Sequence, residues 1–100
     1  MMRAKFIAPA RREFLKEVVY YNEQEPGLGV QFAQEVEEAT ARALAFPESG
    51  SPVTKSTKRV FVKRFPFSVV YRPDPKGIVV FAVAHHSRKP EYWVPRGLQP

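Results

Sequence analysis

The chain has 100 residues, the length of a single domain, and we expect one domain over residues 1–100. It contains no cysteine, which excludes a disulfide framework and a thiolate-bound zinc ion. The formal net charge of +6 is unevenly divided: residues 1–50 hold 6 Lys/Arg and 8 Asp/Glu, and residues 51–100 hold 10 Lys/Arg and 2 Asp/Glu. The halves therefore carry −2 and +8. Such a basic field raises the encounter rate with a polyanion or an acidic protein segment, and the alternative is that the charge serves solubility.

No apolar run approaches the roughly 20 residues that a membrane span needs, and the N-terminus has no apolar core of a signal peptide. We therefore expect a cytoplasmic protein that contacts no membrane.

The first half predicts a strand followed by two helices. Alternating apolar and polar residues over 1–8 predict a short strand at a sheet edge. Apolar residues spaced by one, three and four predict a helix over residues 9–25 and a second over 28–45. The run Pro26-Gly27-Leu28-Gly29 separates them, so we expect a tight helical hairpin. The composition of residues 47–57 predicts a loop.

The second half predicts three strands rich in valine and aromatic residues, over 58–65, 67–72 and 78–85. Strands joined by such short connections pair antiparallel, and the third strand, apolar on both faces, is predicted to be interior. The element order β-α-α-β-β-β predicts an α+β fold. In this fold the helical hairpin packs on one face of a small antiparallel sheet, with the first strand at its edge.

The sheet face turned away from the helices is predicted to mix aromatic and basic side chains. Such a face is either covered by another piece of protein or used as a binding surface. Its guanidinium and ammonium groups are candidate ligands of phosphate or carboxylate, and the alternative is that they are solvated strand residues. The candidates are Arg59, Lys63, Arg64, Arg72, Arg88 and Lys89.

His85 and His86 close the third predicted strand and point to opposite faces. No acidic or thiol partner lies at ligand spacing, so we expect no metal ion. Either imidazole is a candidate general acid or base, or a hydrogen-bonded residue at a strand end. The sequence has no phosphate-cradling glycine loop, and we expect no cofactor.

Tyr92 and Trp93 follow the last strand as an aromatic pair. They either stack on a nucleobase or pin the C-terminal tail to the sheet. Glu91 is one of only two acids in the basic half, and it is predicted to be a charge partner of Arg88 or Arg96 rather than a catalytic base.

Several short runs in a fixed order resemble the RelE/ParE toxin superfamily of type II toxin–antitoxin systems. They are Tyr20-Tyr21 before Pro26-Gly27-Leu28-Gly29, the run RFPFSVVY at 64–71, AVAH at 82–85, and then Arg88, Pro90, Tyr92-Trp93 and Arg96. The resemblance extends over roughly residues 3–96 and is closest to the ParE-like, plasmid-stabilisation branch.

The resemblance implies a toxin that a cognate antitoxin neutralises with an extended, acidic segment. ParE-like members bind and inhibit DNA gyrase, and this is the function that we expect. Binding of target or antitoxin would then involve Arg59, Phe61, Lys63, Phe65, Arg88, Trp93 and Arg96. The family arrangements leave a homodimer and a toxin–antitoxin heterotetramer open.

RelE-like members instead cut ribosome-bound mRNA without a metal, using basic side chains on the sheet and often a terminal tyrosine. This endoribonuclease is the alternative function, and its catalytic candidates are Arg64, Arg72, His85, Arg88 and Tyr92. A non-toxic basic module that binds nucleic acid is the second alternative.

Overall fold

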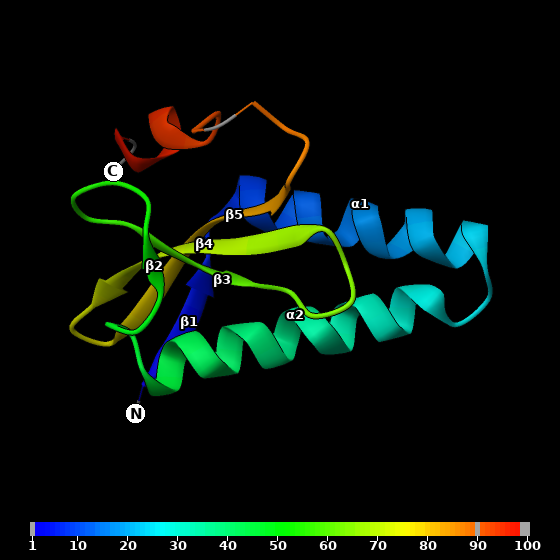
Figure 1. Cartoon of the computed structure of the whole chain (residues 1–100), viewed down its shortest axis with the longest axis horizontal. Coiled ribbons are helices and arrows are strands. Elements are labelled where there is room, and N and C mark those ends of the chain that lie inside the picture. Colours follow the sequence, from blue (N-terminus) through cyan, green and yellow to red (C-terminus); the bar gives the residue numbers. More distant parts are fainter. Residues whose placement is uncertain (1, 90, 99–100) are drawn as a thin grey trace.

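The computed structural model describes residues 2–89 and 91–98. In chain order the elements are β1 (Arg3–Phe6), α1 (Ala8–Gln24), α2 (Leu28–Ala45), β2 (Ser51–Pro52), β3 (Lys58–Phe61), β4 (Phe67–Asp74), β5 (Gly77–His85) and the 3₁₀ helix η1 (Val94–Leu98). The predicted α+β fold is confirmed: α1 and α2 form a hairpin that packs on one face of the sheet (Figure 1). The predicted bounds of α2 agree with the structure, and those of α1 lie within one residue of it.

The sheet is five-stranded, in the order β1-β5-β4-β3-β2. The strands from β2 to β5 pair antiparallel, whereas β1 pairs parallel to β5, with Arg3 opposite Gly77 and Phe6 opposite Val80. The prediction of a wholly antiparallel sheet is therefore wrong for its first strand. A connection as long as a helical hairpin allows two strands to run in the same direction, which a tight turn does not.

Strand β5 lies between β1 and β4, so the predicted interior position of the third valine-rich strand is confirmed. Strand β3 ends at Phe61, four residues before the predicted end. The backbone of Arg64 adopts φ +69° and Pro66 lacks an N–H, so this stretch forms the connection to β4 instead of continuing the ladder. The loop predicted over residues 47–57 contains the two-residue strand β2.

The main core lies between the helices and the sheet. Phe32 on α2 is fully buried and lies 5.0 Å from the Phe67 ring of β4 and 6.1 Å from the Phe14 ring of α1, centroid to centroid. Gly29 brings the helices together, because a Cβ there would collide with the Val18 carbonyl oxygen of α1. The core therefore depends on both aromatic packing and close helix contact.

A second, smaller core lies on the face of the sheet turned away from α1 and α2, which we call the second face. It consists of Val70, Phe81, Ala82 and Trp93. Val70 pairs with Ala82 and Tyr71 with Val80, so Phe81 is an extra residue in β5, a β-bulge. Trp93 comes from the C-terminal segment, which lies across the sheet from α2 (Figure 1). The chain therefore covers part of the second face itself.

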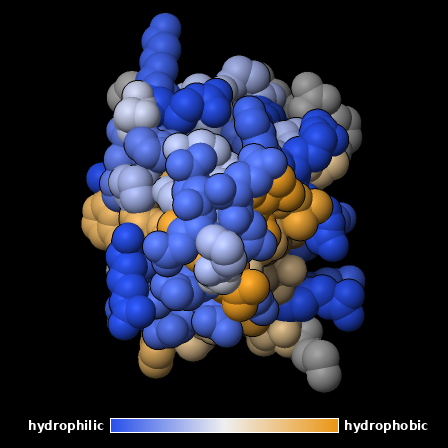
Figure 2. All heavy atoms as spheres, turned by 90° about the vertical axis from the view of Figure 1, so that its right-hand side faces the viewer, coloured by the Kyte–Doolittle hydropathy of each residue, from blue (hydrophilic) through white to orange (hydrophobic). Residues whose placement is uncertain are grey.

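The end of the molecule formed by the α1–α2 turn is mostly hydrophilic, and hydrophobic atoms appear there in separate patches (Figure 2). Within residues 2–89 and 91–98, neither helix is long and apolar enough to cross a membrane.

Candidate functional site

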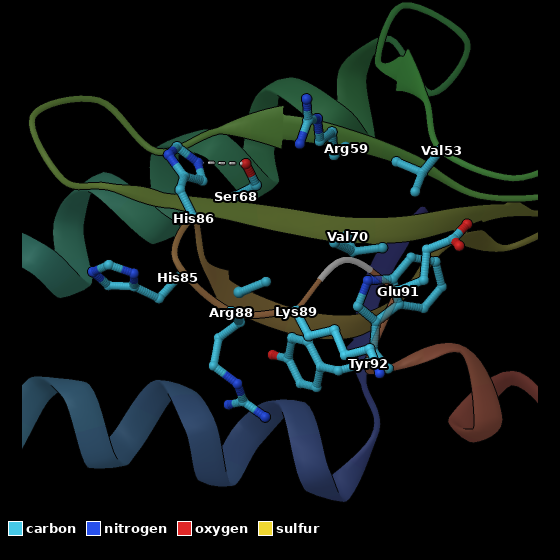
Figure 3. Close-up of a pocket in the computed structure, with 12 residues that line it drawn as sticks. Val53, Arg59, Ser68, Val70, His85, His86, Arg88, Lys89, Glu91 and Tyr92 are labelled. Carbon is cyan, nitrogen blue, oxygen red and sulfur yellow. Dashed lines mark hydrogen bonds between the residues drawn. The ribbon is translucent and has the colours of Figure 1, made fainter.

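A small pocket of about 140 Å³ opens on the second face, between the sheet and the chain that follows β5 (Figure 3). Its polar lining is mainly basic, with one carboxylate. The lining residues are Val53, Arg59, Ser68, Val70, Ala84, His85, His86, Arg88, Lys89, Glu91, Tyr92 and Trp93.

The antiparallel register places one side of this pocket. Arg59 on β3 lies opposite Val70 on β4, and Ser68 on β4 lies opposite Ala84 on β5, so their side chains share the second face. The Ser68 hydroxyl is 2.9 Å from Nε2 of His86, a hydrogen bond drawn in Figure 3. Strands β3 and β4 therefore supply a guanidinium and a hydroxyl, and the residue after β5 supplies an imidazole, to the same small space.

Next to the pocket, Arg59, Phe61 and His86 form what we call the basic strip. The Phe61 side chain is 52% exposed. The Arg59 Cζ lies 5.1 Å from the centre of the Phe61 ring, and the His86 ring meets its edge at 5.5 Å. An exposed aromatic ring fixed between cationic and imidazole groups is suited to a partner that brings both negative charge and apolar surface.

Arg88 occupies the opposite side of the pocket from Arg59 (Figure 3). A turn closed by a bond from its N–H to the His85 carbonyl, at 3.0 Å, places it there. Its Cζ stacks 3.8 Å from the centre of the Tyr92 ring, and its guanidinium extends toward α1. Nδ1 of His85 accepts a hydrogen bond from the Ser87 N–H at 2.9 Å, which braces the same turn.

The Tyr92 hydroxyl is not free to exchange protons with a ligand. It donates a hydrogen bond to Oε2 of Glu13 on α1 at 2.6 Å. Burial, and then the bond to the Glu13 carboxylate, raise the pKa of Tyr92 above its usual value. Tyr92 is therefore held protonated and is unsuited to act as a general base at neutral pH.

The five residues named as catalytic candidates do not meet at one place. His85, Arg88 and Tyr92 line the pocket. Arg64 lies at the β3–β4 connection, 3.8 Å from the Glu35 carboxylate of α2, and Arg72 stacks 5.4 Å from the Phe81 ring, outside the pocket lining.

The residues named for binding are also divided. Arg59, Arg88 and Trp93 line the pocket, and Phe61 lies beside it, but Trp93 is only 5% exposed. The others have internal partners: Lys63 with Glu38, Phe65 with the Tyr21 and Phe32 rings, and Arg96 with Glu13.

Two residues of the site were not singled out from the sequence. Nothing in the local sequence distinguishes Ser68 from the other serines. Only the strand register places it opposite Ala84, on the same face as Arg59. Glu13 looked like one of several charged helix residues, and its partners lie 70 to 83 residues away in the chain. In the described part of the chain, no group of three or more His, Cys, Asp or Glu residues is arranged to hold a metal.

A second cavity, of about 560 Å³, lies between α1, α2 and β1 on the other side of the molecule. It is mainly apolar, and β1 beside it pairs with β5 alone within the described residues. The lining residues are Phe6, Arg11, Phe14, Val36, Glu37, Thr40, Ala41 and Leu44. We call this cavity the helix groove.

The fold and these two surfaces define a small basic α+β protein with surfaces suited to a macromolecular partner. The family model described as the ParE toxin of the type II toxin–antitoxin system parDE matches residues 5–90. The chain therefore belongs to the ParE toxin family, and the resemblance to RelE/ParE toxins is confirmed.

A solved structure titled "Chromosomal ParDE TA system from P. aeruginosa" is similar to this chain, with a TM-score of 0.72. The match covers 85% of this chain and 96% of that one at 19% sequence identity. At this identity the likeness supports the fold. No curated protein sequence matches the chain.

Proposed function

We propose that this ParE-family toxin inhibits DNA gyrase by binding to it, without chemistry of its own, and that a cognate antitoxin neutralises the toxin. Family membership over residues 5–90 supports the toxin role. The proposal that the toxin performs no chemistry of its own is supported by one observation: the candidate catalytic groups do not lie together at one site. Arg64 and Arg72 lie outside the pocket, and Glu13 engages the Tyr92 hydroxyl.

The basic strip supports the antitoxin part of the proposal. An acidic, extended segment lying along Arg59 and Phe61 would find a guanidinium and an exposed aromatic ring together. Apolar residues of the same partner fit the helix groove, where Ala41 is exposed. A segment that folds onto both surfaces would wrap the toxin.

The gyrase part is tested with purified protein, gyrase and relaxed plasmid. We expect loss of supercoiling and accumulation of cleaved DNA complexes, both weakened in the double variant Arg59→Gln/Phe61→Ala. Arg12→Gln, on the exposed side of α1, is the control and should inhibit like the wild type. Full supercoiling in the presence of excess folded toxin would overturn the gyrase part.

The antitoxin part is tested by growth and co-purification. Expression of the chain alone should arrest growth, and the neighbouring antitoxin gene should relieve the arrest. Arg59→Gln/Phe61→Ala and Ala41→Glu should each weaken co-purification of the pair, whereas Arg12→Gln should not. A pair that is equally tight in all variants would remove both surfaces from the proposal.

An mRNA endonuclease remains a second candidate function because of one contact. The His86 imidazole, hydrogen-bonded to Ser68, shares the pocket with Arg59. The pocket thus pairs a candidate general acid or base with a candidate phosphate ligand. This candidate predicts cuts in ribosome-bound mRNA that His86→Ala abolishes. Intact mRNA in cells arrested by the wild-type toxin would contradict it.

A further inference from the structure

A single carboxylate on α1, that of Glu13, joins parts of the chain that are far apart in the sequence. Its Oε1 accepts a hydrogen bond from the backbone N–H of Val83 in β5 at 3.1 Å. Arg96 donates to both carboxylate oxygens at 3.0 and 2.9 Å, and Tyr92 donates to Oε2 at 2.6 Å. The Glu13 side chain is only 16% exposed and that of Arg96 21%, so these charge-assisted bonds are weakly screened by solvent.

Residues 91–98, which we call the strap, are attached to the sheet by side chains. In the described part of the chain, the backbone N–H groups of Tyr92, Val94 and Arg96 bond to the carbonyls of Lys89, Glu91 and Trp93. These bonds are local and add no strand to the sheet. The longer-range attachments are the Glu13 bonds, a bond from Arg96 to the Phe81 carbonyl at 3.0 Å, and the buried Trp93 ring.

The strap begins at a strained residue. Glu91 adopts φ +64°, in the left-handed region that residues other than glycine and asparagine rarely adopt. Such a conformation costs roughly 1–3 kcal/mol and persists only when surrounding contacts hold it. Here the holding contacts are those of Tyr92, Trp93 and Arg96, the next residues of the strap. Opening of the strap therefore releases strain at its hinge.

The strap also shapes the pocket. Glu91, Tyr92 and Trp93 are the part of its wall that the strap supplies. The Tyr92 ring stacks against the guanidinium of Arg88 (Figure 3). Without the strap the pocket loses that wall, Arg88 loses its stacking partner, and the second core loses Trp93 as its cover. Glu13 does not line the pocket. It holds the wall in place through its hydrogen bonds to Tyr92 and Arg96 of the strap.

We propose that the strap is a lid on the second face that opens as a unit about Glu91, and that Glu13 is the catch that keeps it closed. With the catch made, Arg88 is fixed beside the pocket and the apolar second core is covered. With the catch broken, the pocket is dismantled and Val70, Phe81 and Ala82 are uncovered. Glu13 is thus a positioning residue that acts through Tyr92 and Arg96. The proposal holds whether or not gyrase is the target.

The single tryptophan of the chain lies in the strap, so its fluorescence reports opening directly. In Glu13→Gln we expect the open population to rise about ten- to a hundredfold, the usual effect of losing a charged hydrogen-bonding partner. Trp93 emission should shift to longer wavelength and acrylamide should quench it more strongly, with unchanged far-UV circular dichroism. Glu23→Gln, an exposed charge change on the same helix, is the matched control and should leave both signals unchanged. If acrylamide quenches Trp93 no more strongly in Glu13→Gln than in the wild type, the proposal is overturned.

A double-mutant cycle and hydrogen exchange complete the test. Because Glu13 and Arg96 form one catch, Arg96→Gln should open the strap like Glu13→Gln, and the double variant should add little. Fully additive effects would contradict a shared catch. In the wild type, the amides of Val94 and Arg96 should exchange while that of Val69 in β4 stays protected. If all three amides exchange only through global unfolding, the strap does not open as a unit. This measurement uses the wild type and therefore does not depend on whether a variant folds.

Discussion

At the scale of single residues, a few side chains have structural roles that cannot be predicted from their residue types. The Glu13 carboxylate accepts four hydrogen bonds from three distant residues. The hydrogen bond to Glu13 is also the leading cause of the raised pKa of Arg96, which keeps that guanidinium charged. Tyr71 is another such residue: it is fully buried and its hydroxyl donates to the Pro47 carbonyl at 2.7 Å. Individual polar groups thus fix the loops and the tail to the sheet.

Tyr92 should make stability depend on alkaline pH. Its pKa is raised in the folded state, so its contribution is complete below the ordinary tyrosine value of 10.0 and is lost as the pH rises above it. Urea unfolding between pH 8 and 11 should show a loss of stability that is smaller in Tyr92→Phe. Tyr20→Phe, at a half-exposed ring, is the control and should keep the wild-type slope. Equal slopes for wild type and Tyr92→Phe would contradict the expectation.

Gly77 should not tolerate a side chain. It adopts φ +137°, and a Cβ there would collide with the backbone carbonyl oxygen of Arg3, its partner in β1. Gly77→Ala should therefore destabilise the protein by roughly 2–4 kcal/mol, combining strain with displacement of the β1 edge. Gly27→Ala is the matched comparison, because Gly27 also has a positive φ but open space around it, and should cost only about 1 kcal/mol. Thermal unfolding of both variants measures the difference, and equal losses would show that the contact with Arg3 is unimportant.

At the scale of elements, the helical hairpin depends on one close contact. Gly29 in the first turn of α2 lies against the Val18 carbonyl of α1, and its own N–H donates to the Asn22 Oδ1 at 2.8 Å. The sheet is held differently: β4 and β5 pair over eight residue pairs, from Phe67–His85 to Asp74–Gly77, with a bulge in between. The helices are thus positioned by backbone proximity and the central strands by a long ladder.

Gly29→Ala should separate the two helices. Alanine favours helix over glycine by about 1 kcal/mol. The clash with the Val18 carbonyl oxygen and the Asn22 side chain of α1 should outweigh this gain and give a net loss of about 1–3 kcal/mol. Val30→Ala, at the neighbouring exposed position, should change stability by less than about 1 kcal/mol. Chemical denaturation compares the two variants. A Gly29→Ala protein more stable than the wild type would mean that the helices can shift apart without cost.

At the scale of the whole molecule, the two candidate binding surfaces lie on different sides. The basic strip and pocket lie on the second face, and the helix groove lies between the helices and β1. The acids of α2 partly neutralise the β3–β4 connection, because Glu38 lies 3.9 Å from Lys63 and Glu35 lies 3.8 Å from Arg64. Within residues 2–89 and 91–98, no ion pair engages Arg59, Arg88 or Lys89, the three cations that line the pocket.

Retention on a polyanionic column should follow this distribution. Arg59→Glu, in the basic strip, should elute at clearly lower salt than Arg12→Glu, on α1, although both change the net charge equally. Heparin chromatography of the two folded variants at one pH measures this. Identical elution would mean that the net charge of the molecule, and not the basic strip, governs contact with polyanions.

Much of the local architecture was determined by the sequence itself. The apolar spacing of α2, the Pro26-Gly27 break and the valine-rich strands are local signals, since each depends on residues within a few positions of one another. Short local runs in a fixed order, from Tyr20-Tyr21 to Arg96, were also enough for the resemblance to the toxin family that the match over residues 5–90 confirms.

The tertiary structure alone decided the parallel pairing of β1, the burial of Trp93 on the second face and the separation of Arg64 and Arg72 from the pocket. It also brought Glu13 to Tyr92 and Arg96, across 79 and 83 residues. Such contacts depend on how complete elements pack in space, and local periodicity does not encode that packing. In the sequence, a charged helix residue that faces water cannot be distinguished from one that faces a distant arginine.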